Sequence, residues 1–362
     1  MCRPAPRFLV CVLAVVSASS TARAQGCGCV AVQNNVTRGL VEGDLHGNAL
    51  GARQWMASLG FRWFRSDRVF VGDVEQPALY GRMTNEVLSF DASLTYAITD
   101  RWSVTVDMPV SDGRRTSAYE HDGVDTYTMT AAGPGDLRLT ADAWILDPRT
   151  AHRGNVAVGF GVVFPTGIAG ATDTAHRATG PVERPVDASI QPGVGAWGVV
   201  LQLQAYLRIH AGLFAYADGF YLVRPQEQNG TEYTQADLEV RSAPLGTTPT
   251  RDSAPDQYVA RLGLGYVLWP AQGLSMSVGG RVEGIPVHDL VGGDGGFRRP
   301  GAALAVEPGL TWSYRGNALS LTVPVAVYRD RVQSVPEAAA GQAAGPAAFA
   351  DVSVLARYTR RF

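Results

Sequence analysis

The sequence has no apolar run long enough to cross a membrane as a helix. Its most apolar stretch, residues 8–16, is too short, because a spanning helix needs roughly 20 apolar residues. An excess of one charge is also lacking, since 31 basic residues stand against 33 acidic ones and no basic cluster occurs. The sequence therefore argues against a helical membrane anchor and indicates no nucleic-acid partner.

Cysteine is scarce. Of four cysteines, Cys2 and Cys11 lie in an N-terminal stretch that we expect to be removed, which leaves Cys27 and Cys29. An exported pair can oxidise, but a one-residue spacing makes a strained ring. A closed metal site needs more ligands than a lone pair supplies. Cys27 and Cys29 are therefore weak candidates for a metal site, and we expect no cofactor.

Motifs that carry enzyme chemistry are missing as well. The chain contains no His-Glu-x-x-His and no Gly-x-Ser-x-Gly. Its six histidines are scattered and fall mostly in predicted loops or turns. We therefore expect that the protein is not an enzyme.

The N-terminus is typical of an exported protein. Arg3 and Arg7 precede the apolar stretch, and an Ala-x-Ala cleavage site ends at Ala24. We expect residues 1–24 to be a signal peptide and residues 25–50 to be a periplasmic leader or plug segment. A lipoprotein modified at Cys27 is the alternative, although its lipobox lacks the usual leucine.

What the sequence does contain is alternation. Twelve segments alternate apolar with polar or small side chains, which indicates strands with two different faces. Each has about the 9–11 residues that a tilted membrane strand requires. The 41 glycines and the mean hydropathy near zero fit hydrophobicity that is spread over such strands. The segments are residues 54–63, 88–98, 102–108, 136–145, 156–164, 199–208, 213–223, 257–268, 274–283, 304–314, 319–327 and 349–362.

The connections between these segments alternate in length. Long ones follow the odd-numbered strands and short ones the even-numbered strands, which is the pattern of outer-membrane barrels. We therefore predict an all-β fold over residues 51–362: a transmembrane antiparallel up-and-down β-barrel of about 12 strands, with short periplasmic turns and long extracellular loops. A soluble secreted β-protein is the alternative. The long connections are 65–86, 111–134, 165–187, 224–256, 287–299 and 329–348; the short ones are 99–101, 146–155, 209–212, 269–273 and 315–317.

Aromatic residues support this orientation. Five tryptophans fall at the predicted periplasmic ends of strands and Trp63 at an outer end, as in interfacial girdles. Tyr358 and Phe362 end the last strand and resemble the C-terminal signal that the barrel assembly machinery reads. We expect this machinery and outer-membrane lipid to be partners. The five tryptophans are Trp55, Trp102, Trp144, Trp269 and Trp312.

The polar face of the strands would line a lumen. It carries six residues of each charge, so no strong ion selectivity follows. The charges either pair and hold a narrow interior together or line a permeation path, and a twelve-strand barrel allows both. The candidates are Arg62, Arg138, Arg208, Arg261, Arg281 and Arg357, with Asp91, Asp107, Asp136, Asp142, Glu283 and Glu307.

Three segments carry a family resemblance. Residues 133–137 read Gly-Pro-Gly-Asp-Leu, residues 164–167 read Phe-Pro-Thr-Gly, and residues 190–197 read Ile-Gln-Pro-Gly-Val-Gly-Ala-Trp. This pattern resembles the outer-membrane family named for the meta-pathway of phenol degradation, over roughly residues 87–270. The resemblance implies a β-barrel transporter, distantly like long-chain fatty-acid transporters, with hydrophobic or aromatic small molecules as cargo. Physically, the glycines permit a tight entry into the fourth strand.

We therefore expect an outer-membrane channel or transporter of a Gram-negative bacterium, through which small molecules diffuse. The alternative is a narrow, side-chain-filled barrel with a structural or surface-interaction role. Paired charges inside the barrel would favour the alternative, whereas unpaired charges and a continuous cavity would favour transport.

Overall fold

The structure is a computed structural model that describes residues 50–239 and 249–362. The predicted signal peptide, nearly all of the predicted leader and the Cys27–Cys29 pair lie outside the described residues. Within them, no helix is both long and apolar enough to cross a membrane.

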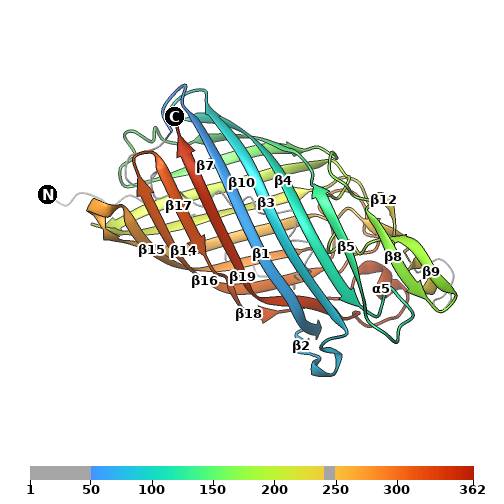
Figure 1. The fold of residues 1–362 in the computed structure, drawn as a ribbon. Helices are drawn as coiled ribbons and strands as arrows, with labels where there is room; N and C mark the ends of the chain where they lie inside the picture. The colour runs from blue at the N-terminus through green and yellow to red at the C-terminus, as the bar shows by residue number, and fades with distance from the viewer. Residues whose placement is uncertain (1–49, 240–248) are drawn as a thin grey trace.

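Twelve antiparallel wall strands form a closed barrel, which confirms the predicted fold (Figure 1). The barrel closes where the first strand pairs with the last, from Met56 opposite Arg361 to Phe70 opposite Ala347. The fourth and eleventh wall strands are each made of two pieces. In wall order the strands are β1 (Trp55–Val71), β3 (Met83–Ala97), β4 (Trp102–Ser117), β5 (Tyr127–Pro134) with β6 (Arg138–Trp144), β7 (Gly154–Val163), β10 (Gly198–His210), β11 (Leu213–Val223), β14 (Gln257–Trp269), β15 (Leu274–Ile285), β16 (Gly301–Tyr314), β17 (Asn317–Thr322) with β18 (Val325–Arg329), and β19 (Ala347–Arg361).

The barrel wall exposes apolar side chains on its outside and buries charged side chains inside, which is the reverse of a soluble protein. Large apolar side chains such as Leu59, Leu201 and Leu262 are exposed, whereas the acidic Asp91 and Asp107 are almost completely buried. Because apolar surface is stable against lipid and charge is stable against water or other charges, this arrangement fits a wall between lipid and a polar interior.

The two ends of the barrel differ. One end has the tight turns, including the short helix η3 (Pro270–Gln272), and both chain termini of the described barrel. The other end, which we call the elaborate end, carries additional hairpins and short helices, which gather on one side of Figure 1. It comprises β2 (Val74–Glu75), η2 (Pro77–Leu79), the hairpin of β8 (Thr172–Arg177) and β9 (Gly180–Pro185), the hairpin of β12 (Gln228–Glu232) and β13 (Arg251–Ser253), α4 (Ala236–Glu239) and α5 (Val335–Ala339).

Several strands run further toward the elaborate end than the alternation predicted. Strand β1 continues to Val71 and β3 starts at Met83, so the predicted loop 65–86 shrinks to residues 72–82 around β2 and η2. In this part of β1, Arg65 is exposed on the outer face and Ser66 is buried on the inner face. Both faces are polar there, so the period-2 signal disappears although the backbone pairing continues.

The tryptophans lie where the alternation predicted. The five named above are at the end with the tight turns, and Trp102 and Trp269 are among the most exposed side chains. Trp63 lies further along β1, where its indole N–H donates a 3.0 Å hydrogen bond to Glu86 Oε1. An apolar ring with a polar partner is suited to the boundary between lipid and water.

Candidate functional site

The interior of the barrel holds eleven of the twelve predicted lumen residues. Arg261, Glu283 and Arg357 are partly buried, whereas Arg208 is exposed. Arg208 lies two residues before β10 ends at His210, so it is exposed at the turn end of the barrel. The other eight are buried: Arg62, Asp91, Asp107, Asp136, Arg138, Asp142, Arg281 and Glu307.

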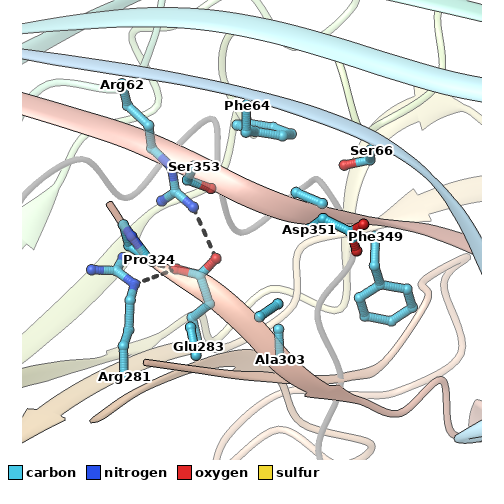
Figure 2. Close-up of a pocket in the computed structure, with 13 residues that line it drawn as sticks. Arg62, Phe64, Ser66, Arg281, Glu283, Ala303, Pro324, Phe349, Asp351 and Ser353 are labelled. Carbon is cyan, nitrogen blue, oxygen red and sulfur yellow. Dashed lines mark hydrogen bonds and ion pairs between the residues drawn. The ribbon is translucent and has the colours of Figure 1, made fainter. Parts of the chain in front are cut away.

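An ion pair crosses the interior. Arg62 Nη2 on β1 lies 2.8 Å from Glu283 Oε1 on β15, although β19, β17–β18 and β16 separate these strands in the wall. Glu283 Oε2 lies 2.7 Å from Arg281 Nη2 on its own strand (Figure 2). The pair therefore bridges part of the lumen and narrows it, which the sequence could not show.

The bridge continues along the neighbouring strands. Arg281 Nη1 lies 3.3 Å from Glu307 Oε2 on β16, and Glu307 also pairs with Arg261 on β14. Arg261 Nη1 in turn lies 3.3 Å from Asp218 Oδ1 on β11. The alternation did not single out Asp218, because it interrupts an aromatic row. The chain contains no lysine, so all these cations are planar arginines, which can bind two carboxylates at once.

A further ion pair lies on the opposite side of the lumen. Arg357 Nη2 on β19 lies 2.9 Å from Asp91 Oδ2 on β3. This pair crosses β1 at Gly60, where a Cβ atom would lie 2.3 Å from Asp91 Oδ1. Next to Asp91, Asp107 on β4 faces Arg138 on β6 in the strand register.

Both carboxylate oxygens of Asp107 are buried and lack a hydrogen-bond partner among the described residues, as do the hydroxyls of Ser89 and Ser111 nearby. Burying a polar group without a partner costs free energy, and such groups are normally satisfied by ordered water. The inner face of β3 and β4 is therefore suited to water, and ion pairs link the charged residues of β14 to β16.

A segment of the β7–β10 connection folds back into the elaborate end of the barrel. We call residues 186–196 the mouth segment. Its Ile190 is completely buried in an apolar cluster with Phe64, Val87, Met129 and Ala131, from β1, β3 and β5. The mouth segment therefore packs against the inner wall and reduces the opening.

Asp136, between β5 and β6, fastens this segment. Its Oδ1 accepts a hydrogen bond from the Gly167 N–H at 3.0 Å, and its Oδ2 accepts one from the Val194 N–H at 2.9 Å. A Cβ atom at Gly167 would lie 2.5 Å from the carbonyl carbon of Gly135, and one at Gly193 would lie 2.8 Å from Gly167 Cα. The three segments that carry the family resemblance thus meet at one carboxylate, and their glycines permit the backbones to touch.

A second buried group fastens the other end of the mouth segment. The Asp187 carboxylate pairs with Arg299 at 2.6 Å and lies 3.9 Å from Arg115 Nε. Burial by itself would raise the pKa of Asp187, but Arg115 and Arg299 outweigh it and hold this pKa well below its usual range. Asp187 is therefore ionised at every physiological pH.

The predicted assembly residues lie at the end with the tight turns. The Tyr358 hydroxyl donates to Asn317 Oδ1 at 2.7 Å, and the Phe362 ring is exposed. The backbones of Phe362 and Trp55 exchange hydrogen bonds of 2.8 and 3.0 Å. No group of three or more His, Cys, Asp or Glu side chains could hold a metal ion in the part of the chain that the structure describes.

Comparison of this chain with proteins of known structure identifies its fold. The COG4313 outer membrane channel from Pseudomonas putida F1 matches with a TM-score of 0.58 and 15% identity, over 87% of this chain and 97% of that chain. The chain has the outer-membrane β-barrel fold. The translocator domain of the autotransporter NalP from Neisseria meningitidis also matches, with a TM-score of 0.46 and 11% identity, over 95% of this chain and 100% of that chain. No family model and no curated protein matches the sequence, so the resemblance to the phenol meta-pathway family stays a prediction.

This fold and the apolar exterior together support a location in the outer membrane of a Gram-negative bacterium.

Proposed function

We propose that the protein is an outer-membrane channel through which small molecules diffuse along a narrow, hydrated lumen. The observation that carries the proposal is a group of buried polar atoms without partners on the inner face of β3 and β4. The buried Asp107, Ser89 and Ser111 on β3 and β4 present polar atoms without partners among the described residues, beside the ion pairs that link β14 to β16. A file of water along β3 and β4 would satisfy these atoms and carry a small solute.

The cargo is a small organic molecule rather than a bulky one, because the Arg62–Glu283 pair and the mouth segment narrow the passage. The family resemblance of the sequence favours hydrophobic or aromatic cargo. The proposal includes cleavage after Ala24, insertion into outer-membrane lipid and recognition of Tyr358 and Phe362 by the assembly machinery.

The second candidate is a structural or surface-interaction barrel. It is favoured by the number of lumen charges that pair with one another, since such pairs hold a narrow interior together. The two candidates differ in one measurable property, which is whether ions pass through the lumen.

Single-channel conductance of refolded residues 25–362 in a planar lipid bilayer tests the proposal. We expect small ohmic steps, and larger steps for Arg62→Ala/Glu283→Ala, because this double variant removes the bridge across the lumen without changing the net charge. The matched control is Arg65→Ala/Asp67→Ala, which removes an exposed pair of 3.1 Å near the elaborate end of β1 and leaves the step size unchanged. A folded barrel that stays silent in all three forms would contradict the channel and leave the structural role.

A further inference from the structure

A recess opens in the inner wall beside the Arg62–Glu283 bridge, and no part of the proposed function so far explains it. It lies between β1, β15, β16, β18 and β19 and encloses about 490 Å³ not filled by protein atoms, part of which is open solvent (Figure 2). We call it the alanine recess, because its walls include Ala303, Ala305, Ala326 and Ala350.

The recess exists because the wall is irregular at this level. Pro324 separates β17 from β18, and the pairing of β1 with β19 shifts register between Phe64 and Ser66. The inner positions of β16 before Glu307 carry only the methyl groups of Ala303 and Ala305, which leaves space on the β16 side. Phe64 and Phe349 add two aromatic rings to the lining, and Ser66, Asp351 and Ser353 add polar groups, of which the Asp351 carboxylate is paired with Arg68 and Arg329.

The polar end of the recess offers hydrogen-bond donors. Arg62 is about 1% exposed, and only its Nη2 bonds Glu283; its Nε and Nη1 are buried without a hydrogen-bond partner among the described residues. Both oxygens of Glu283 are already used, Oε1 by Arg62 and Oε2 by Arg281. An occupant of this end must therefore supply an acceptor oxygen, and a buried guanidinium favours a negatively charged one.

We propose that the alanine recess binds a small monocarboxylate with a compact apolar body. Its carboxylate accepts hydrogen bonds from Arg62 Nε and Nη1, and its body packs against the alanines and the two phenylalanine rings. A cationic ligand of the same shape is repelled by the guanidinium and leaves its two donors unbonded. As the cargo of the channel, this ligand class rests on the proposed function, but its binding is measured without transport.

Binding of benzoate to refolded residues 25–362 in detergent micelles, followed by saturation-transfer NMR, tests the inference. Benzylammonium is the comparison ligand, and protein-free micelles correct for partitioning. We expect saturable binding of benzoate and none of benzylammonium. Arg62→Gln weakens benzoate binding at least tenfold, because the glutamine amide offers neither the charge nor the paired donors of the guanidinium.

Because the loss of Arg62 also removes the bridge to Glu283, a second variant tests the recess without changing any charge. Ala305→Leu fills the recess and leaves every charge in place, so we expect at least tenfold weaker binding. Ala260→Leu, on the lipid-facing side of β14, is the matched control and leaves binding unchanged. A gel shift on heating checks that each variant is folded. Equal binding to the wild type and Ala305→Leu, or no saturable binding, would overturn the inference.

Failure of this inference is distinguishable from failure of the proposed function. A conducting barrel that does not bind benzoate overturns the recess as a ligand site and leaves the channel intact. A barrel that binds benzoate and never conducts keeps the site and overturns the channel.

Discussion

Asp136 provides the sharpest test of how the mouth segment is held. Replacing it with alanine removes both acceptors of the Gly167 and Val194 N–H groups at a buried position. A hydrogen bond to a charged group contributes roughly 1.5–3 kcal/mol, so the two bonds together amount to about 3–6 kcal/mol. Since about 1.4 kcal/mol is a factor of ten, local opening of the segment should increase by about 10² to 10⁴.

Hydrogen–deuterium exchange of the refolded protein, read by mass spectrometry on peptides that cover residues 186–197, measures this opening. We expect much faster exchange there in Asp136→Ala than in the wild type. The amides of β4 and β7 keep their protection, because their pairing with β6 uses backbone groups only. Asp136→Asn is expected to be intermediate, since one of its two side-chain atoms is still an acceptor.

The matched control is Asp112→Ala, which removes an exposed carboxylate on the outer face of β4. It is expected to leave exchange in the mouth segment unchanged. Equal exchange of residues 186–197 in Asp136→Ala and the wild type would refute the reasoning, because the segment would then be held by its apolar contacts alone.

Three further results are expected. Gly60→Ala pushes a methyl group against the Asp91 carboxylate and should cost about 1–3 kcal/mol, measured as a lower midpoint in heat-modified gel mobility, while Gly280→Ala, with open space around it, changes nothing. Burial raises the pKa of Asp252 well above its usual range, so its contribution to stability is present at low pH and is lost as pH rises through the folded-state pKa. Asp252→Asn should therefore slow amide exchange in β12 and β13 at pH 8 but not at pH 4, and equal exchange at pH 8 would count against a buried charge. Deleting Phe362 should lower the amount of protein in isolated outer membranes, and an unchanged amount would argue against its role in assembly.

Much of the barrel could be predicted because its strands obey a local rule. Alternation assigns each residue to one face of the wall, which is why Arg62, Asp91 and Glu307 are recognisable as interior residues. The same rule assigns Arg208 to the inner face but carries no information about its height along the barrel, and Arg208 is exposed near the end of β10. It also ends β1 too early, because residues 65–68 are polar on both faces and the pairing of β1 with β19 shifts register there.

The mouth segment shows a second limit of prediction from the sequence. Its residues have no period, and of the glycines at 135, 167 and 193 only Gly135 was given a role, in a tight entry into the fourth strand. These three backbones touch one another and share the Asp136 carboxylate only because segments 30 to 60 residues apart in the sequence lie side by side. Sequence spacing carries no information about such contacts.

By itself, the sequence determined the strands, the face on which each side chain lies and the alternation of short turns with long connections, because these depend on neighbouring residues along one chain. Only the tertiary structure decided which charges meet inside. Whether Arg62 reaches Glu283, or Arg357 reaches Asp91, depends on how the closed barrel sets the distances across its lumen, and closure is a property of all the strands together.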